Sequence, residues 1–213
     1  MRILHISDTH GLPIEPPDEP FDVVVHSGDL MPNASFGVRA IERRFQPQWL
    51  EERLSNLPPR YRDQPMLLCP GNHDFVDPTP ALRKAGVDAR LLIGALEVGG
   101  VRFWGHPWTP TFYDWNYMCE PDAMEEHLAP VAERMARGEI DVLVSHGPMR
   151  GVLDRNQSGE RCGCPVLRRV LEAASRRPRL VLCGHIHESA GEMQWKDVTV
   201  SNAACTQRIL TLS

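Results

Sequence analysis

The first apolar run of the chain leads directly into a polar loop: Ile3-Leu4-His5-Ile6-Ser7-Asp8-Thr9-His10-Gly11. The run is short and rich in branched side chains, which is typical of a buried strand in a parallel sheet. A carboxylate and an imidazole, Asp8 and His10, follow it at once. Ligands of open α/β sheets bind at the carboxyl ends of strands. This one stretch therefore predicts a strand and one side of a functional site.

The same arrangement returns four times further along the chain. Short apolar runs at residues 21–25, 66–69, 142–144 and 180–183 each lead into a polar segment. These segments hold, in order, Asp29, the triplet Asn72, His73 and Asp74, then His146, and last His185 and His187. Because the carboxyl ends of parallel strands meet at one edge of a sheet, we expect the five segments to form one site.

Helical and hairpin patterns fill the intervals between these runs. Apolar residues recur every three or four positions over residues 38–54, 124–135 and 166–174, which predicts amphipathic helices with Glu and Arg on the outer face. Extended segments at 91–98 and 101–105 favour a hairpin at Gly99-Gly100, and those at 191–195 and 198–200 favour another at Lys196-Asp197. A last extended segment covers residues 209–212. Alternating strands and helices with added hairpins indicate an α/β fold with two packed, mixed sheets covered by helices.

Length, hydrophobicity and charge limit the classes of protein to which this chain could belong. The length of 213 residues suits one domain. No apolar run approaches the roughly 18–20 residues of a membrane span, and the first residues lack a signal-peptide pattern, so we expect a cytoplasmic protein without a membrane partner. The net charge of −5 argues against binding extended nucleic acid, although it is compatible with a single nucleotide. The oligomeric state is left open.

The six cysteines are expected to be reduced and structural. Cys162 and Cys164 are separated by one residue, whereas zinc knuckles usually space their thiols by two to four. A redox pair or a thiolate metal site at these two residues is the alternative.

The ordered series Asp-x-His, Gly-Asp, Gly-Asn-His-Asp, His and Gly-His-x-His resembles the calcineurin-like metallophosphoesterase superfamily over residues 8–187. His146-Gly147-Pro148 and Gly184 to Glu188 are similar to its small metallophosphoesterase-domain branch, which includes cyclic-nucleotide phosphodiesterases. The resemblance implies a four-layer α/β/β/α sandwich, formed by a single domain over residues 1–213.

The resemblance also implies a ligand set for two divalent metal ions. One ion would be held by Asp8, His10, Asp29 and His187, and the other by Asp29, Asn72, His146 and His185. Two ions roughly 3.5–4 Å apart need a shared ligand, and a carboxylate such as Asp29 has two oxygens with which to bridge them. Mixed imidazole and oxygen donors suit Mn, with Fe, Zn or Ni as alternatives.

The resemblance assigns catalytic roles to His73 and Asp74. His73 would face the leaving group as a general acid or electrostatic stabiliser, and Asp74 would orient it. The expected reaction is hydrolysis of a small phosphodiester, such as a 2′,3′- or 3′,5′-cyclic nucleotide, by in-line attack of a metal-bridging hydroxide. The alternatives are a broad phosphomonoesterase, a nuclease, or a catalytically silent metal-binding scaffold.

Two further features stay open at this stage. His26 and His106 are candidates for supporting or substrate contacts. The aromatic residues Trp108, Phe112, Tyr113, Trp115 and Tyr117 would form either a wall that stacks a base or a hydrophobic cluster that pins a long loop.

Overall fold

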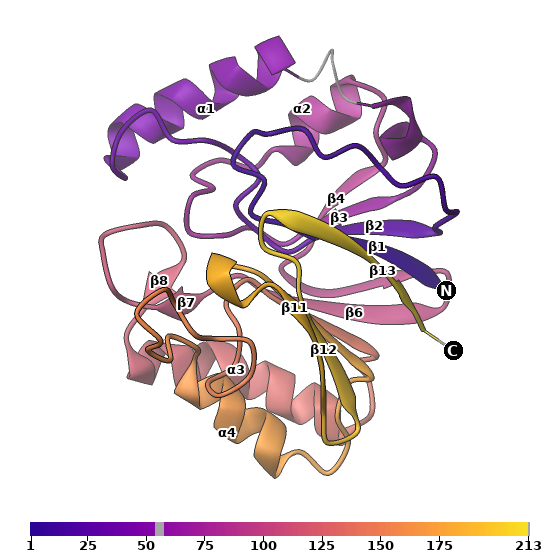
Figure 1. Ribbon diagram of the computed structural model, residues 1–213, viewed down its shortest axis with the longest axis vertical. Helices are drawn as coiled ribbons and strands as arrows, with labels where there is room; N and C mark the ends of the chain where they lie inside the picture. The colour runs from indigo at the N-terminus through magenta and orange to yellow at the C-terminus, as the bar shows by residue number, and fades with distance from the viewer. Residues whose placement is uncertain (54–57, 213) are drawn as a thin grey trace.

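The computed structural model describes residues 1–53 and 58–212. Its elements form four layers, from top to bottom in Figure 1: helices α1 and α2, a first sheet, a second sheet, and helices α3 and α4. The helices span Arg39–Arg53 (α1), Thr79–Lys84 (α2), Pro121–Ala136 (α3) and Pro165–Ala173 (α4). The predicted α/β/β/α sandwich with two mixed sheets is confirmed.

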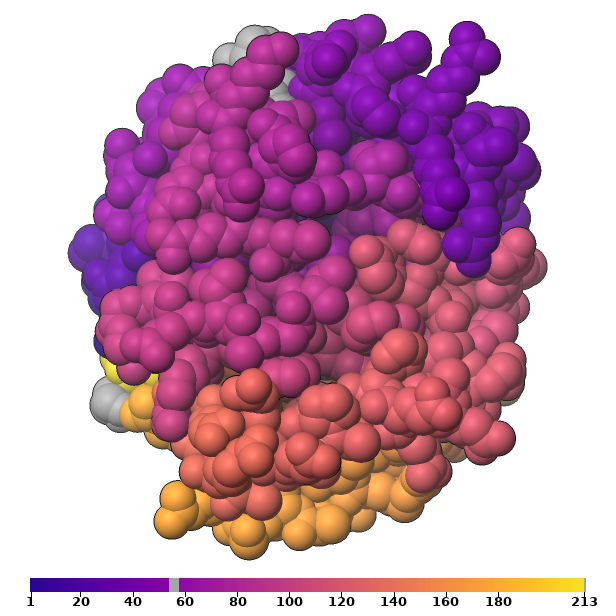
Figure 2. Space-filling model, turned by 180° about the vertical axis from the view of Figure 1, so that it is seen from behind, coloured from indigo at the N-terminus to yellow at the C-terminus, as the bar shows by residue number. Residues whose placement is uncertain are grey.

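The first sheet has the strand order β13-β1-β2-β3-β4. The strands span Arg2–Ser7 (β1), Val23–His26 (β2), Met66–Leu68 (β3), Ala89–Leu91 (β4) and Thr206–Thr211 (β13). Strands β1 to β4 are parallel, and β13 returns from the end of the chain to pair antiparallel with β1. Seen from behind, the N-terminal segments in purple and magenta occupy the upper part of the molecule and the later ones in salmon and orange the lower part (Figure 2).

The second sheet has the order β11-β12-β10-β9-β6-β5. Its strands span Gly94–Val98 (β5), Val101–His106 (β6), Val142–Ser145 (β9), Leu180–Cys183 (β10), Gly191–Trp195 (β11) and Val198–Asn202 (β12). The four inner strands are parallel, and the two edge strands join them through the predicted hairpins at Gly99-Gly100 and Lys196-Asp197. A small parallel pair, Thr109–Pro110 (β7) and Met118–Cys119 (β8), lies outside both sheets.

The hydrophobic core has three parts, one between the two sheets and one under the helices on each side. Residues of both sheets, among them Val25, Leu67, Phe103 and Val144, pack between the sheets, and further clusters lie under the helices on each side. Strands β2, β9 and β10 are buried at every residue. Parallel strands covered on both faces have this continuous burial. Their carboxyl ends are therefore held rigidly relative to one another.

The predicted elements differ from the observed ones in several places. The extended segment at residues 91–98 is two strands in different sheets, because the buried Leu92 packs between the sheets where the chain crosses from β4 to β5. Helix α2 was not predicted from the sequence. Among the described residues, no helix has the length and apolar character needed to cross a bilayer.

Helix α1 differs from its predicted orientation. Val38 and Ile41, expected on the inner face, are 51% and 47% exposed, whereas Glu42 and Gln46 are fully buried. The predicted helix also included Leu54, which lies outside the described residues. Periodicity marked the helix correctly, and Leu50 is buried as expected. Glu42 and Gln46 share the inner face with it because they bond the loops of the site, as described below.

Candidate metal centre

The loops after β1, β2, β3, β9 and β10 meet at one edge of the sandwich, as the sequence predicted. Four residues of the ligand set have a strained backbone: Asp8, His10, Asp29 and His185 have positive φ angles of 52°, 47°, 57° and 68°. Such backbone is uncommon for residues other than glycine and clusters at functional sites. Hydrogen bonds between the loops hold it, since the amide of Asp8 donates to Gly28 O at 2.8 Å and that of His185 to the Asp8 carboxylate at 2.9 Å.

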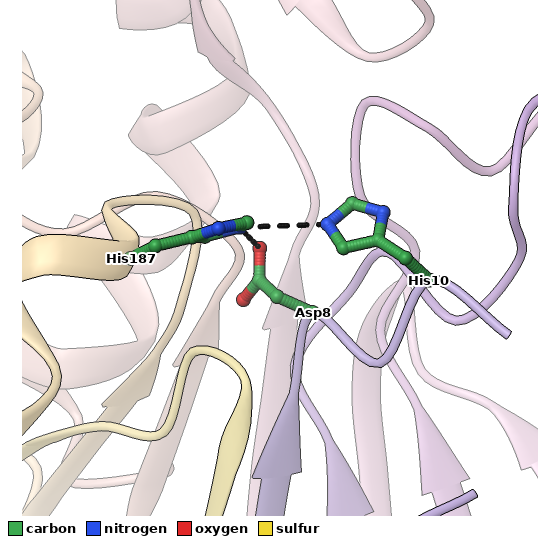
Figure 3. A group of neighbouring side chains, drawn as sticks. All are labelled: Asp8, His10 and His187. Carbon is green, nitrogen blue, oxygen red and sulfur yellow. Dashed lines mark hydrogen bonds and ion pairs between the residues drawn. The ribbon is translucent and has the colours of Figure 1, made fainter. Parts of the chain in front are cut away.

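Asp8, His10 and His187 form the first group of converging donor atoms (Figure 3). His187 Nε2 lies 3.3 Å from Asp8 Oδ1 and 3.4 Å from His10 Nε2. Asp8 and His10 come from the loop after β1, and His187 begins the short 3₁₀ helix His187–Ser189. His10 and His187 therefore both present Nε2 beside the buried Asp8 carboxylate. This arrangement of donor atoms suits a divalent cation.

Asp29, His146 and His185 form a second group. His146 Nε2 lies 3.3 Å from Asp29 Oδ2 and 2.9 Å from Asn72 Oδ1. Asp29 also belongs to a third group, with His10 and His73, so its carboxylate lies between the donors of the first group and those of the second. The structure thus brings all seven predicted ligands together, with Asp29 in the central place.

Two glycines permit this close approach. A Cβ at Gly71 would lie 2.2 Å from Asp29 Oδ1, and one at Gly184 would lie 2.0 Å from Asp8 Oδ2. Neither clash can be relieved without moving a buried carboxylate. Gly71 of Gly-Asn-His-Asp and Gly184 of Gly-His-x-His are therefore required, because any side chain there would collide with Asp29 or Asp8.

The electrostatics of the site suit a cation. Asp8 and Asp29 are each 1% exposed, and buried carboxylates need cationic partners. Burial lowers the pKa of His146, but the adjacent Asp29 carboxylate outweighs burial and the pKa rises to about 9. Both ring nitrogens of His146 then donate, Nε2 to Asn72 Oδ1 and Nδ1 to Ser27 O at 3.0 Å. A divalent ion would replace the Nε2 proton, and the bond to Ser27 would still orient the ring.

His73 lies beside this group and is held by residues that the sequence did not single out. Its Nδ1 bonds the side-chain oxygen of Asn33, and its Nε2 lies 3.9 Å from Asp29 Oδ2. The Trp115 ring packs against it, with centroids 4.0 Å apart. Burial lowers the pKa of His73. Asn33 follows Asp29 by four residues, but nothing in a lone Asn marks it as a partner of a distant His.

The expectation that Asp74 orients His73 is corrected by this geometry. The Asp74 carboxylate turns under the loops and accepts from four backbone amides, those of Asp29, Leu30, Met31 and Gly71, at 2.9 to 3.3 Å. Burial and the nearby Asp29 raise the pKa of Asp74 to about 7. Asp74 therefore ties the loop after β2 to the loop after β3, and Asn33 takes the place beside His73.

The buried polar face of α1 supports the same loops. Gln46 donates to His73 O at 2.6 Å and accepts from the Phe75 amide at 2.8 Å. Glu42 accepts from the amides of Ala34 and Ser35 and from the Ser35 hydroxyl at 2.6 to 2.9 Å. These contacts fix the segments that carry Asn33 and His73.

The other open candidates are now placed. His26 is buried and its Nε2 lies 3.1 Å from the Thr9 hydroxyl, within the loop that carries Asp8 and His10. His106 is buried at the end of β6, and neither ring nitrogen has a partner among the described residues. Cys205 was not anticipated, yet its Sγ lies 3.5 Å from Nδ1 of His187.

The described cysteines contribute to none of the candidate metal sites. The described cysteines are free, and none belongs to the clusters of converging donors in the described part of the chain. Cys164 is buried at the start of α4, where its Sγ accepts from the Leu167 amide at 3.3 Å.

Comparison with known proteins defines the class. A model of the calcineurin-like phosphoesterase family matches residues 1–189. The chain belongs to this family. The family typically binds two divalent metal ions, which fits the groups of Asp and His donors described above.

Individual relatives include a member of the branch that the sequence resembles. The chain is 29% identical over 237 residues to metallophosphoesterase domain-containing protein 1 of Homo sapiens, which covers 96% of this chain. It spans 66% of that relative, slightly less than two thirds of its length. It is also 27% identical over 208 residues to a probable rhamnogalacturonate lyase C of Emericella nidulans, of which it spans 18%.

Solved structures agree on the fold. One crystal structure aligns with a TM-score of 0.64 at 15% identity, covering 94% of this chain and 89% of the other. A structure described as "GAP50 the anchor in the inner membrane complex of Plasmodium" aligns with a TM-score of 0.57 at 13% identity, covering 95% and 71%. At these identities the likeness concerns the fold alone.

Proposed function

We propose that the protein hydrolyses small phosphodiesters with two divalent metal ions, with Mn as the preferred metal. Asp8, His10, Asp29 and His187 would hold one ion. Asp29, Asn72, His146 and His185 would hold the other. When bound, such a pair lowers the pKa of water and stabilises the charge that develops on phosphoryl oxygens.

The observation that carries the proposal is the place of Asp29 between the donor groups. Its Oδ2 lies 3.3 Å from His146 Nε2, and the same carboxylate belongs to the cluster that contains His10. One carboxylate shared by two groups of donors could serve both ion positions. Asn72 contributes a neutral oxygen, so the set binds two ions without cancelling their positive charge, which then attracts an anionic phosphoryl group.

His73 would act on the leaving oxygen. Asn33 occupies its Nδ1, so Nε2 faces the Asp29 side, in the cleft. The negative charge of a bound phosphodiester favours the protonated imidazole, although burial disfavours it. Nε2–H can then donate to the oxygen that leaves phosphorus, which is general acid catalysis.

The cleft suits a small substrate. Its volume is about 600 Å³, and Asp29, Asn72, His73, His185 and His187 lie in its wall. The branch resemblance supports a phosphodiester, with 2′,3′- and 3′,5′-cyclic nucleotides as the first candidates.

Metal-dependent turnover tests the proposal. We expect the Mn-loaded protein to hydrolyse bis-p-nitrophenyl phosphate, to lose this activity on chelation and to regain it when Mn is restored. A panel of cyclic nucleotides and monoesters on the same preparation then identifies the preferred ester. A protein that holds two metal ions by elemental analysis but turns over none of these esters would be a scaffold, and the proposal would fail.

A further inference from the structure

The loop between β7 and β8 places aromatic rings at the edge of the cleft. Phe112 lines the cleft together with Asp29, His73 and His185, and it is 54% exposed. Tyr113 and Phe36 continue the series at 56% and 73% exposure. Large aromatic side chains left this exposed beside a cleft are unusual unless they meet a ligand.

These rings form a continuous arc from one side of the candidate metal centre to the other. Ring centroids are separated by 5.6 Å from His185 to Phe112, 5.7 Å from Phe112 to Tyr113 and 5.2 Å from Tyr113 to Phe36. The arc then continues from Phe36 to Trp115 at 5.3 Å and from Trp115 to His73 at 4.0 Å. The two tyrosine contacts are edge-to-face, at 78° and 88°, and 54% of Phe112 stays exposed.

The loop that carries Phe112 is anchored by residues other than Phe112. Arg39 of α1 donates to Asp114 at 2.9 Å and to Trp115 O at 2.7 Å, and the Asn116 side chain donates to Asp74 O at 2.6 Å. Trp115 is 6% exposed, and Trp108 stacks on His127 of α3 at 3.8 Å. The buried Trp115 and the partly buried Trp108 therefore pin the loop, and Phe112 is presented outward from it.

We infer that Phe112 is a specificity-determining residue that stacks on a planar aromatic group of the substrate ester. This inference rests on the proposed function, since it places the phosphoryl group at the metal centre and the aromatic group against the adjacent ring. Stacking on an aromatic side chain tolerates any planar ring. An aryl ester and a nucleobase share this chemistry.

Non-hydrolysable ligands test the inference without turnover. Phenylphosphonate, cyclohexylphosphonate and methylphosphonate carry the same anionic head, and only the first has a flat ring. We expect the metal-loaded wild type to bind phenylphosphonate most tightly by calorimetry. Phe112→Ala should weaken that binding about tenfold, the loss of one stacking contact, and leave methylphosphonate unchanged. Phe112→Tyr should restore it.

A matched control removes another exposed apolar side chain. Met193 is 44% exposed on the edge strand β11, so Met193→Ala should bind all three ligands as the wild type does. Because Phe112 contacts the His185 ring, the metal content of each variant is measured first. Binding of a nucleoside 5′-phosphonate to the wild type and to Phe112→Ala is then measured. If Phe112→Ala weakens the binding of this ligand, the aromatic group is a nucleobase. If it weakens the binding of phenylphosphonate alone, the aromatic group is that of an aryl ester.

The outcomes separate this inference from the proposed function. If metal-loaded wild type binds no phosphonate, the proposed function fails. If it binds them and Phe112→Ala weakens neither aromatic ligand, Phe112 does not contact the substrate and only the inference fails. Equal weakening of phenyl- and cyclohexylphosphonate would show a general apolar contact and would also overturn it.

Discussion

At the scale of single residues, we assign metal binding to Asp29 and the chemical step to His73. Asp29 is buried among the donors, whereas His73 touches it only at 3.9 Å and has its other nitrogen occupied by Asn33. Removal of the carboxylate should therefore affect metal binding, and removal of the imidazole should affect the chemical step.

We predict that Asp29→Asn loses both metal and activity. His73→Ala should keep the metal content of the wild type while kcat falls by about 10²- to 10⁴-fold, the usual contribution of a general acid. Elemental analysis and steady-state kinetics measure the two effects. A His73→Ala protein that no longer holds metal would contradict this division.

Asn33 offers a second test at this scale. Asn33→Ala leaves His73 Nδ1 without its partner and should lower kcat. Asn33→Asp places a negative charge beside the imidazole, which raises the pKa of His73. Because His73 acts in its protonated form, the alkaline limb of the kcat profile should move to higher pH. A profile that stays in place in Asn33→Asp would show that the two side chains are not coupled.

At the scale of elements, α1 has its polar residues inward. Glu42 accepts three hydrogen bonds from residues 34 and 35, and Gln46 binds the His73 segment. Arg39 of the same helix holds the loop that carries Trp115. One helix therefore positions the segments on two sides of the cleft, which explains why it buries charge and amide groups while Ile41 is exposed.

Glu42→Ala should destabilise the protein by about 1–3 kcal/mol or more, because it leaves buried backbone donors unpaired. Urea unfolding measures the change in the free energy of unfolding. Arg43→Ala, which removes an exposed neighbour on the same helix, is the control and should stay within about 0.5 kcal/mol of the wild type. Equal effects of the two substitutions would refute the role given to the inner face.

At the scale of the whole molecule, several neutral histidines are enclosed in the sandwich. Burial lowers the pKa of His5 and His106 to about 3 and that of His26 to about 4. His5 lies between the hydroxyls of Ser27 and Ser201, each 2.9 Å away, and so links the two sheets. The unfolded chain protonates these residues near pH 6.5, well before the folded protein does.

Stability should therefore fall as the pH decreases below about 6.5. In that range the unfolded state binds more protons than the folded state, so each such histidine contributes a slope of up to about 1.4 kcal/mol per pH unit. His146 and His187 have raised pKa values, so their contribution to stability is present below about pH 6.5 and is lost as the pH rises above it. The test compares urea unfolding of the wild type and His5→Gln at pH 7.5 and 5.5. A smaller loss on acidification is expected for His5→Gln, and identical losses would rule out His5.

The sequence by itself determined most of the strands, the layered fold and the polar residues after the five buried strands. Apolar periodicity and the position of Asp, Asn and His relative to the strand ends are local properties, and parallel strands of one sheet necessarily bring their carboxyl ends together. The tertiary structure alone decided which side chains support them. Asn33 beside His73, Asp74 under the loops, the inward Glu42 and the exposed Phe112 depend on contacts between segments far apart in the chain, and such contacts have no period and leave no local signal.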